Sequence, residues 1–100
     1  MFIAVLDVST TAADRPAALA TLDGERDEVL AMPGNVAFRV YAARENDTRI
    51  TVVHEWEDQV SFEGYLASAV FERSGKALRP LMTDAPVSRR FHADLLETVG

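Results

Sequence analysis

The sequence predicts an α+β fold in which strands and helices follow one another in the order βαββαβ. Three observations support this prediction. Apolar runs rich in strand-forming residues occur at residues 2–8, 35–43 and 48–56. Two stretches, beginning near residues 14 and 58, instead space their apolar residues three or four positions apart, as amphipathic helices do. A further strand pattern, in which polar and apolar residues are mixed, follows Pro86 near the end of the chain.

The first half of the chain predicts one strand and one helix. Residues 2–8 form the strand, and a Ser-Thr-Thr sequence ends it. Asp14 is placed to cap the helix, and Pro16 is tolerated in its first turn. We expect the helix to run to about Met32, where Pro33 and a glycine end it. Its loose apolar stripe consists of Leu19, Leu22, Val29 and Leu30.

The middle of the chain predicts a hairpin. Residues 35–43 and 48–56 both alternate in polarity, and a Glu-Asn-Asp turn at 45–47 joins them. Side chains two residues apart share a face of a strand. One face of the second hairpin strand therefore carries Ile50, Val52, His54 and Trp56.

The remaining elements complete a ferredoxin-like arrangement with an antiparallel sheet. A helix is expected at residues 58–69, followed by a helical segment at 71–82 that Gly75 interrupts. Pro86 then opens a last strand that runs to about residue 96.

Helices on one face of such a sheet leave the other face uncovered. Several residues that point to this second face are apolar, and an isolated chain would expose them to water. They are Ile3, Val5, Ala37, Tyr41 and Val53. A homodimer with sheet facing sheet would bury them, which predicts a dimeric α+β barrel.

Composition narrows the classes of function. The chain of 100 residues predicts a single domain, residues 1–100, and its net charge of -6 argues against nucleic acid as a partner. Arg89 and Arg90 are the only adjacent basic pair. No apolar run approaches the roughly 20 residues of a membrane span. The absence of cysteine, and of a basic residue before the first apolar run, leads us to expect a cytoplasmic protein.

Four short motifs carry a resemblance to a known family. They are a Pro33-Gly34 step before NVAFRVY, the strand end VVHEWED, the helix FEGYLAS leading to Phe71, and the strand after Pro86. Over nearly its whole length the chain resembles the antibiotic biosynthesis monooxygenase (ABM) family. The resemblance implies a dimeric α+β barrel with a pocket between the helices and the sheet of each protomer. Such proteins include cofactor-free oxygenases that act on anthrones or quinols, and heme-degrading enzymes.

The chain also departs from these relatives. Many carry a histidine in the helix where this sequence has Tyr65, and the anthrone-oxidising branch has an asparagine at the position of Val52. The heme-degrading branch places its iron-ligating histidine at the position of Gly75. Because glycine cannot ligate iron, the resemblance argues against heme as a cofactor.

Three residues are candidates for catalysis. His54 can act as a general base toward a phenolic proton, because imidazole titrates near neutrality, or it can be a hydrogen-bonded core histidine. Tyr65 can orient a substrate oxygen, or it can be an ordinary core tyrosine. Trp56 can stack on an aromatic ligand or act as a packing anchor.

The expected walls of a substrate pocket could equally be plain core. They are Phe38, Val52, Phe62 and Phe71. His92 has polar neighbours and is expected at the surface or the dimer rim. A metal site shared by Asp7, His54 and His92 lacks any local ligand spacing, so no metal is expected.

The sequence therefore favours a homodimeric, cofactor-independent monooxygenase that oxidises a small phenol, quinol or anthrone-like compound with molecular oxygen. The alternative is a non-catalytic small-molecule-binding or structural dimer of the same fold. Loss of the histidine and asparagine of the relatives favours this alternative.

Overall fold

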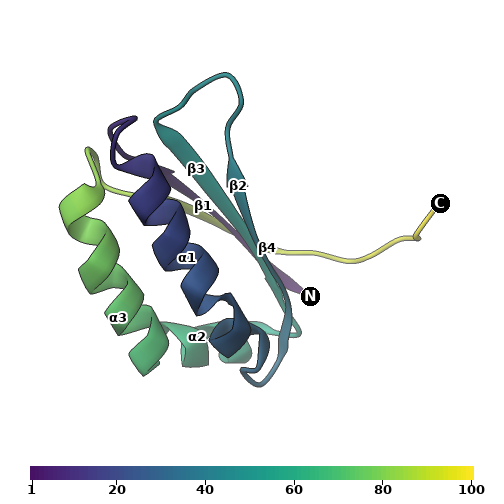
Figure 1. Ribbon diagram of the computed structural model, residues 1–100. Helices are drawn as coiled ribbons and strands as arrows, with labels where there is room; N and C mark the ends of the chain where they lie inside the picture. Colours follow the sequence, from purple (N-terminus) through teal and green to yellow (C-terminus); the bar gives the residue numbers. More distant parts are fainter.

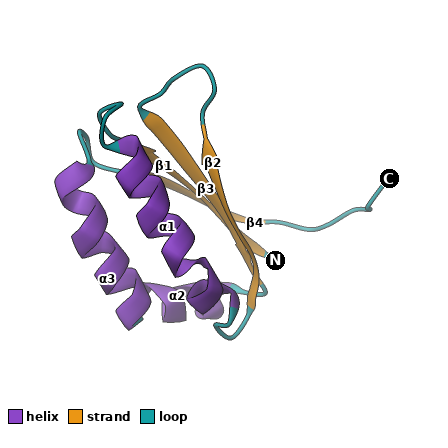
Figure 2. Cartoon of the chain, viewed as in Figure 1, coloured by secondary structure: helices purple, strands orange, loops and turns teal.

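The structure is a computed structural model that describes residues 1–100, and it confirms the βαββαβ order. Its elements are β1 (Phe2–Ser9), α1 (Arg15–Leu30), β2 (Asn35–Ala42), β3 (Arg49–Trp56), α2 (Gln59–Leu66), α3 (Ala69–Leu78), a 3-10 turn (Arg79–Leu81) and β4 (Val87–His92). Helices α1 and α3 lie side by side across one face of the sheet, and α2 lies near their ends (Figures 1 and 2). No helix combines the length and the apolar character that crossing a membrane requires.

The four strands form one antiparallel sheet in the order β2-β3-β1-β4. In β1, Ala4 is opposite His54 on one side and Arg90 on the other. Paired residues point to the same face, so these side chains all face the helices. The predicted inner face of β3 is confirmed, because Ile50, Val52, His54 and Trp56 are all buried.

The open face of the sheet is less exposed than its sequence pattern predicts. A register shift between Asn35 and Ala37 disturbs the alternation in β2, and both Ala37 and Phe38 are buried. The expectation that an isolated chain exposes Ala37 is therefore wrong. Tyr41 is exposed as predicted, whereas the apolar side chains of β1 and β3 on this face are half-buried.

Helix α1 begins where expected, but its cap differs from the prediction. Asp14 occupies the N-cap position without a side-chain hydrogen bond, and its own backbone N–H donates to Thr11 Oγ1 at 3.1 Å. Leu22 and Val29 are buried against the sheet, as the stripe predicts. Leu30 is 45% exposed, because the position next to Val29 is turned about 100° away around the helix axis.

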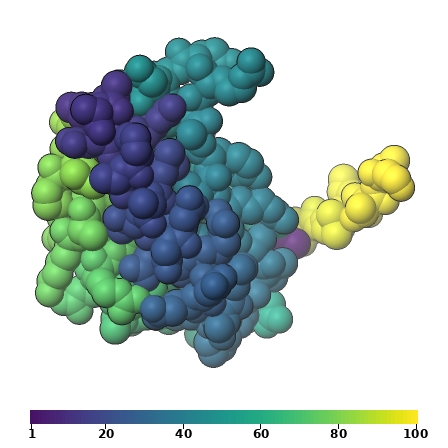
Figure 3. All heavy atoms as spheres, in the orientation of Figure 1, coloured from purple at the N-terminus to yellow at the C-terminus, as the bar shows by residue number.

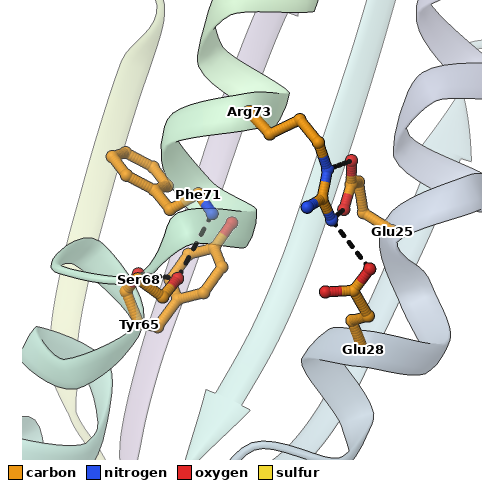
Figure 4. Close-up of polar contacts among 6 residues, drawn as sticks. All are labelled: Glu25, Glu28, Tyr65, Ser68, Phe71 and Arg73. Atoms are coloured by element: carbon orange, nitrogen blue, oxygen red, sulfur yellow. Dashed lines mark hydrogen bonds and ion pairs between the residues drawn. The ribbon is translucent and has the colours of Figure 1, made fainter.

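The two helical pieces predicted after β3 are separated at Ser68, but the predicted interruption of the second at Gly75 is wrong. Ser68 is extended, and its Oγ accepts a hydrogen bond from the Phe71 N–H at 3.2 Å (Figure 4). The same hydroxyl donates to the Tyr65 carbonyl oxygen at 2.6 Å. A side-chain cap of this kind starts a new helix, and α3 then continues through Gly75.

The last strand is shorter than predicted and ends at His92, not at residue 96. The cause is the length of its neighbour, because β4 pairs with β1 and β1 begins at Phe2. The final bond runs from the Ala93 N–H to the Met1 carbonyl oxygen at 2.8 Å. Residues 93–100 then extend away from the rest of the chain (Figure 3).

The turn before β2 links three parts of the fold. Gly34 has a φ of +80°, a conformation that side-chain-bearing residues rarely adopt. A Cβ atom there would collide with the Ser61 hydroxyl of α2. The Gly34 carbonyl oxygen accepts a hydrogen bond from the Glu57 N–H at 2.8 Å, at the end of β3.

We expect Gly34→Ala to lower the free energy of unfolding by ~2 kcal/mol, because it adds both backbone strain and a steric collision. Gly24→Ala is the matched control, because Gly24 lies within α1 and has no atom within 4 Å of its would-be Cβ. That variant should gain about 0.5–1 kcal/mol. Urea denaturation measures both, and a Gly34→Ala protein as stable as the wild type would contradict the analysis.

Candidate functional site

A cavity of about 680 Å³ lies between the sheet and helices α2 and α3. This volume is within the usual range of small-molecule sites. Its walls are mainly apolar, and they include all four residues that the sequence predicted as substrate contacts: Phe38, Val52, Phe62 and Phe71. His54 and Tyr65 also line the cavity, so the fold places two of the three catalytic candidates in its wall.

His54 lies within a cluster of aromatic rings. The centroid of its imidazole is 5.7 Å from the ring of Phe38, 5.6 Å from that of Phe62 and 5.5 Å from that of Tyr65. The side chain is only 4% exposed. These contacts come from β2 and α2, so the hairpin and the following helix together hold the imidazole in place.

The imidazole makes one hydrogen bond within the chain, which the Trp56 indole Nε1–H donates to His54 Nδ1 at 2.9 Å. An indole nitrogen can only donate, so Nδ1 must offer its lone pair. In the neutral ring the proton is therefore on Nε2. The only fully buried side-chain polar atom without a partner is Asn35 Oδ1, so the unbonded Nε2 of His54 retains access to the cavity.

The surroundings of His54 keep the ring neutral. Burial, together with the positive charge of Arg90, lowers the pKa of His54 to about 4. At neutral pH the side chain thus presents an Nε2–H donor to the cavity. The role of general base requires a free lone pair at that nitrogen, so the base role expected from the sequence stays a prediction that needs the other tautomer.

Tyr65 presents a second donor. Burial, together with the negative charge of Glu25, raises the pKa of Tyr65 to about 12, so the hydroxyl stays protonated. The ring packs 5.2 Å from that of Phe71, centroid to centroid. Figure 4 shows how Arg73 of α3 holds Glu25 of α1, with a distance of 2.9 Å between Nη2 and Oε2.

Trp56 lies behind the site and not in it. Its side chain is fully buried and does not line the cavity, so it cannot stack on a ligand there. Its ring packs 5.3 Å from that of Tyr65, centroid to centroid, while its N–H bonds to His54. The packing alternative for Trp56 therefore fits the geometry, with the added task of orienting the imidazole.

Comparison with known proteins gives the family. Residues 1–77 match the family described as Antibiotic biosynthesis monooxygenase. The chain belongs to the ABM family. Membership supports monooxygenase activity at the level of the family, whose enzymes generally need no cofactor and are typically homodimers. No curated protein matches the sequence.

Solved structures of other proteins share the fold. A Deinococcus radiodurans protein assigned as an antibiotic biosynthesis monooxygenase has a TM-score of 0.90 and 16% identity, covering 100% of this chain and 99% of that one. A Nitrosomonas europaea protein assigned likewise has a TM-score of 0.88 and 12% identity, with 93% and 98% covered. Rv0793 from Mycobacterium tuberculosis has a TM-score of 0.86 and 14% identity, with 98% of each chain covered. At these identities the likeness concerns the fold.

The sequence did not predict that two arginines of this ABM chain belong to the site. Arg79 and Arg90 both line the cavity. Strand alternation separates Arg90 from its neighbour Arg89, which lies on the open face with Nη2 3.6 Å from Asp7 Oδ2. The alternation was readable in the sequence, but which face Arg90 takes depends on the register with β1, which the sequence does not give.

The remaining polar candidates lie apart from the centre of the cavity. Asp7 accepts a hydrogen bond from Thr51 Oγ1 at 2.7 Å. Both residues lie on the open face of the sheet, whereas His54 lies on the face that the helices cover. His92 is exposed beside the ring of Phe2, as its surface prediction implied. Gly75, which stands where heme-degrading relatives are expected to carry a histidine, forms part of the cavity wall.

The pKa of His54 has a consequence for stability. Between pH 6.5 and 4 the unfolded chain binds a proton at this residue that the folded chain does not. The free energy of unfolding should therefore fall as the pH drops, by ~2 kcal/mol between pH 7 and pH 5. His54→Gln keeps an acceptor for the indole N–H but has no imidazole, so this part of the loss should vanish. Equal pH slopes in urea denaturation of the two proteins would contradict the assignment.

Proposed function

We propose that the chain is a cofactor-independent monooxygenase that oxidises a small phenol, quinol or anthrone-like compound with molecular oxygen. For an anthrone, one oxygen atom replaces the two hydrogens of the methylene group to form the quinone carbonyl, and the other oxygen leaves as water. The substrate supplies all the electrons, so no external reductant is needed. An apolar cavity with two protonated donors supports this choice.

The single observation that carries the proposal is the hydrogen bond from Trp56 to His54. It directs the Nε2–H of His54 toward the cavity, where it can donate to a substrate oxygen. The protonated hydroxyl of Tyr65 supplies a second donor from α2. Donors fixed in an apolar site stabilise a developing oxyanion more strongly than water does.

In this mechanism the substrate reacts as its anion, having passed its proton to water at the mouth of the cavity as it enters. His54 and Tyr65 lower the pKa of the bound substrate by stabilising the anionic form. The electron-rich anion then reduces oxygen directly. The rings of Phe38, Phe62 and Phe71 hold the aromatic system and exclude water, which keeps the donor contacts strong.

Two substitutions of His54 separate a donor from a base. His54→Gln can accept from Trp56 through its carbonyl oxygen and donate through its amide, so it should retain oxidation within about tenfold of wild type. His54→Leu removes the donor and should lower the rate by about 10²–10³-fold. Oxygen uptake with anthrone and with a quinol measures both, per folded molecule.

The outcomes of that experiment are distinct. If His54 is instead the general base, both variants should lose about 10²–10⁴-fold. If the wild-type protein binds these compounds and consumes no oxygen, the alternative of a non-catalytic binding dimer is supported. Thermal melting of each variant controls for loss of fold.

The proposed active form is a homodimer with sheet facing sheet. Exposed apolar side chains on the open face support it: Tyr41, Val87 and Phe91. Ion pairs between neighbouring strands neutralise the charges on this face, with Arg39 Nη1 2.8 Å from Glu55 Oε2. A neutral, partly apolar sheet face is suited to a second copy of itself.

Val53→Asp should shift the protein from dimer to monomer, because it places an unpaired carboxylate in the middle of this face. Val60→Asp is the matched control, because Val60 is 75% exposed on α2, away from the sheet. Light scattering at micromolar concentration should give twice the chain mass for wild type and control. A monomeric wild-type protein would refute the dimer.

A further inference from the structure

Two guanidinium groups at the cavity have no acidic partner in the chain. Arg79 follows the end of α3, and Arg90 lies on β4; both are exposed, so they mark the mouth of the cavity. Neither has a carboxylate oxygen within 4.0 Å. Five other basic residues do: Arg26, Arg39, Arg73, Lys76 and Arg89. Arg15, Arg44 and Arg49 also lack an ion pair, but they lie outside the cavity, so Arg79 and Arg90 are the unpaired cations that a ligand there would meet.

Each guanidinium is anchored through one nitrogen only. Arg90 Nε donates to Ser88 Oγ at 3.2 Å, and its guanidinium carbon lies 4.9 Å from the centroid of the Phe62 ring. Arg79 Nε donates to the Gly75 carbonyl oxygen at 3.0 Å. The terminal nitrogens of both groups make no hydrogen bond within the chain and are free to bind a ligand.

The position of Arg90 relates this charge to the proposed reacting end of the cavity. Arg90 and His54 are both opposite Ala4, one on each side of β1. The small alanine lies between them on the face that the helices cover. The acidic side chain at the cavity, Glu72, has its own partner, with Oε1 3.3 Å from Lys76 Nζ. The charge left for a ligand is therefore positive.

We propose that the substrate is an aromatic acid whose carboxylate binds Arg79 and Arg90 at the mouth of the cavity, while its hydroxylated ring reaches His54. This inference rests on the proposed function for the ring end of the ligand. A guanidinium donates parallel N–H groups that match a carboxylate, and such charge-assisted bonds are stronger than neutral ones. The apolar walls would bind the ring, and the arginines would select acids over neutral compounds.

Calorimetric titration with two matched probes tests the proposal. The probes are 6-hydroxy-2-naphthoate and its neutral amide, 6-hydroxy-2-naphthamide, which share the hydroxylated ring system. The acid should bind at least about tenfold more tightly than the amide. Arg79→Gln and Arg90→Gln should each weaken binding of the acid by about tenfold and leave the amide unchanged.

Arg26→Gln is the control, because it removes the same charge from a half-exposed position on α1 outside the cavity. It should change neither affinity. If acid and amide bind equally and the arginine variants change neither, the carboxylate assignment is overturned while the aromatic site stands. If neither probe binds the wild-type protein, both this inference and the proposed function fail.

Discussion

The chemistry of the cavity depends on one hydrogen bond between side chains two residues apart on β3. Because the indole of Trp56 has only a donor, its contact with His54 fixes which imidazole nitrogen holds the proton. Burial then keeps the ring neutral at neutral pH, so the proton stays on Nε2. A histidine in solution can exchange its proton between two nitrogens, whereas this one offers the cavity a fixed donor. The apolar walls matter for the same reason, since they prevent water from competing for that donor.

The rest of the fold holds this pair and the cavity in position. The turn at Gly34 ties the start of β2 to the end of β3 and allows α2 to approach closely. Ser68 connects α2 to α3 and so sets where Tyr65 meets Phe71. Across the helices, Arg73 bonds to Glu25 and bridges α1 to α3. The Gly34 and Arg73 contacts join elements that are distant in sequence, so a local pattern could not predict them, whereas the Ser68 cap spans only three residues on each side.

Local patterns predicted the parts of the structure that depend on local physics. The alternating polarity of β3 predicted which of its residues face the core, and the acidic residues after Trp56 predicted the start of α2. The patterns failed where a partner decides the result. The end of β4 at His92 is set by its pairing with Phe2 of β1, and Arg90 enters the site through its register with Ala4. The two-residue spacing predicted that Trp56 and His54 share one face. Their hydrogen bond and the resulting tautomer depend on side-chain geometry that the spacing does not give.

The position of Trp56 also gives the protein an internal optical signal. It is the only tryptophan in the chain, so the tryptophan fluorescence of the protein arises from a single indole. That indole is fully buried and bonded to an imidazole whose other nitrogen faces the cavity. Protonation of the imidazole, or contact of a ligand with it, changes the electronic surroundings of the emitting ring. The emission of the unmodified protein therefore reports directly on the state of the residue at the centre of the cavity.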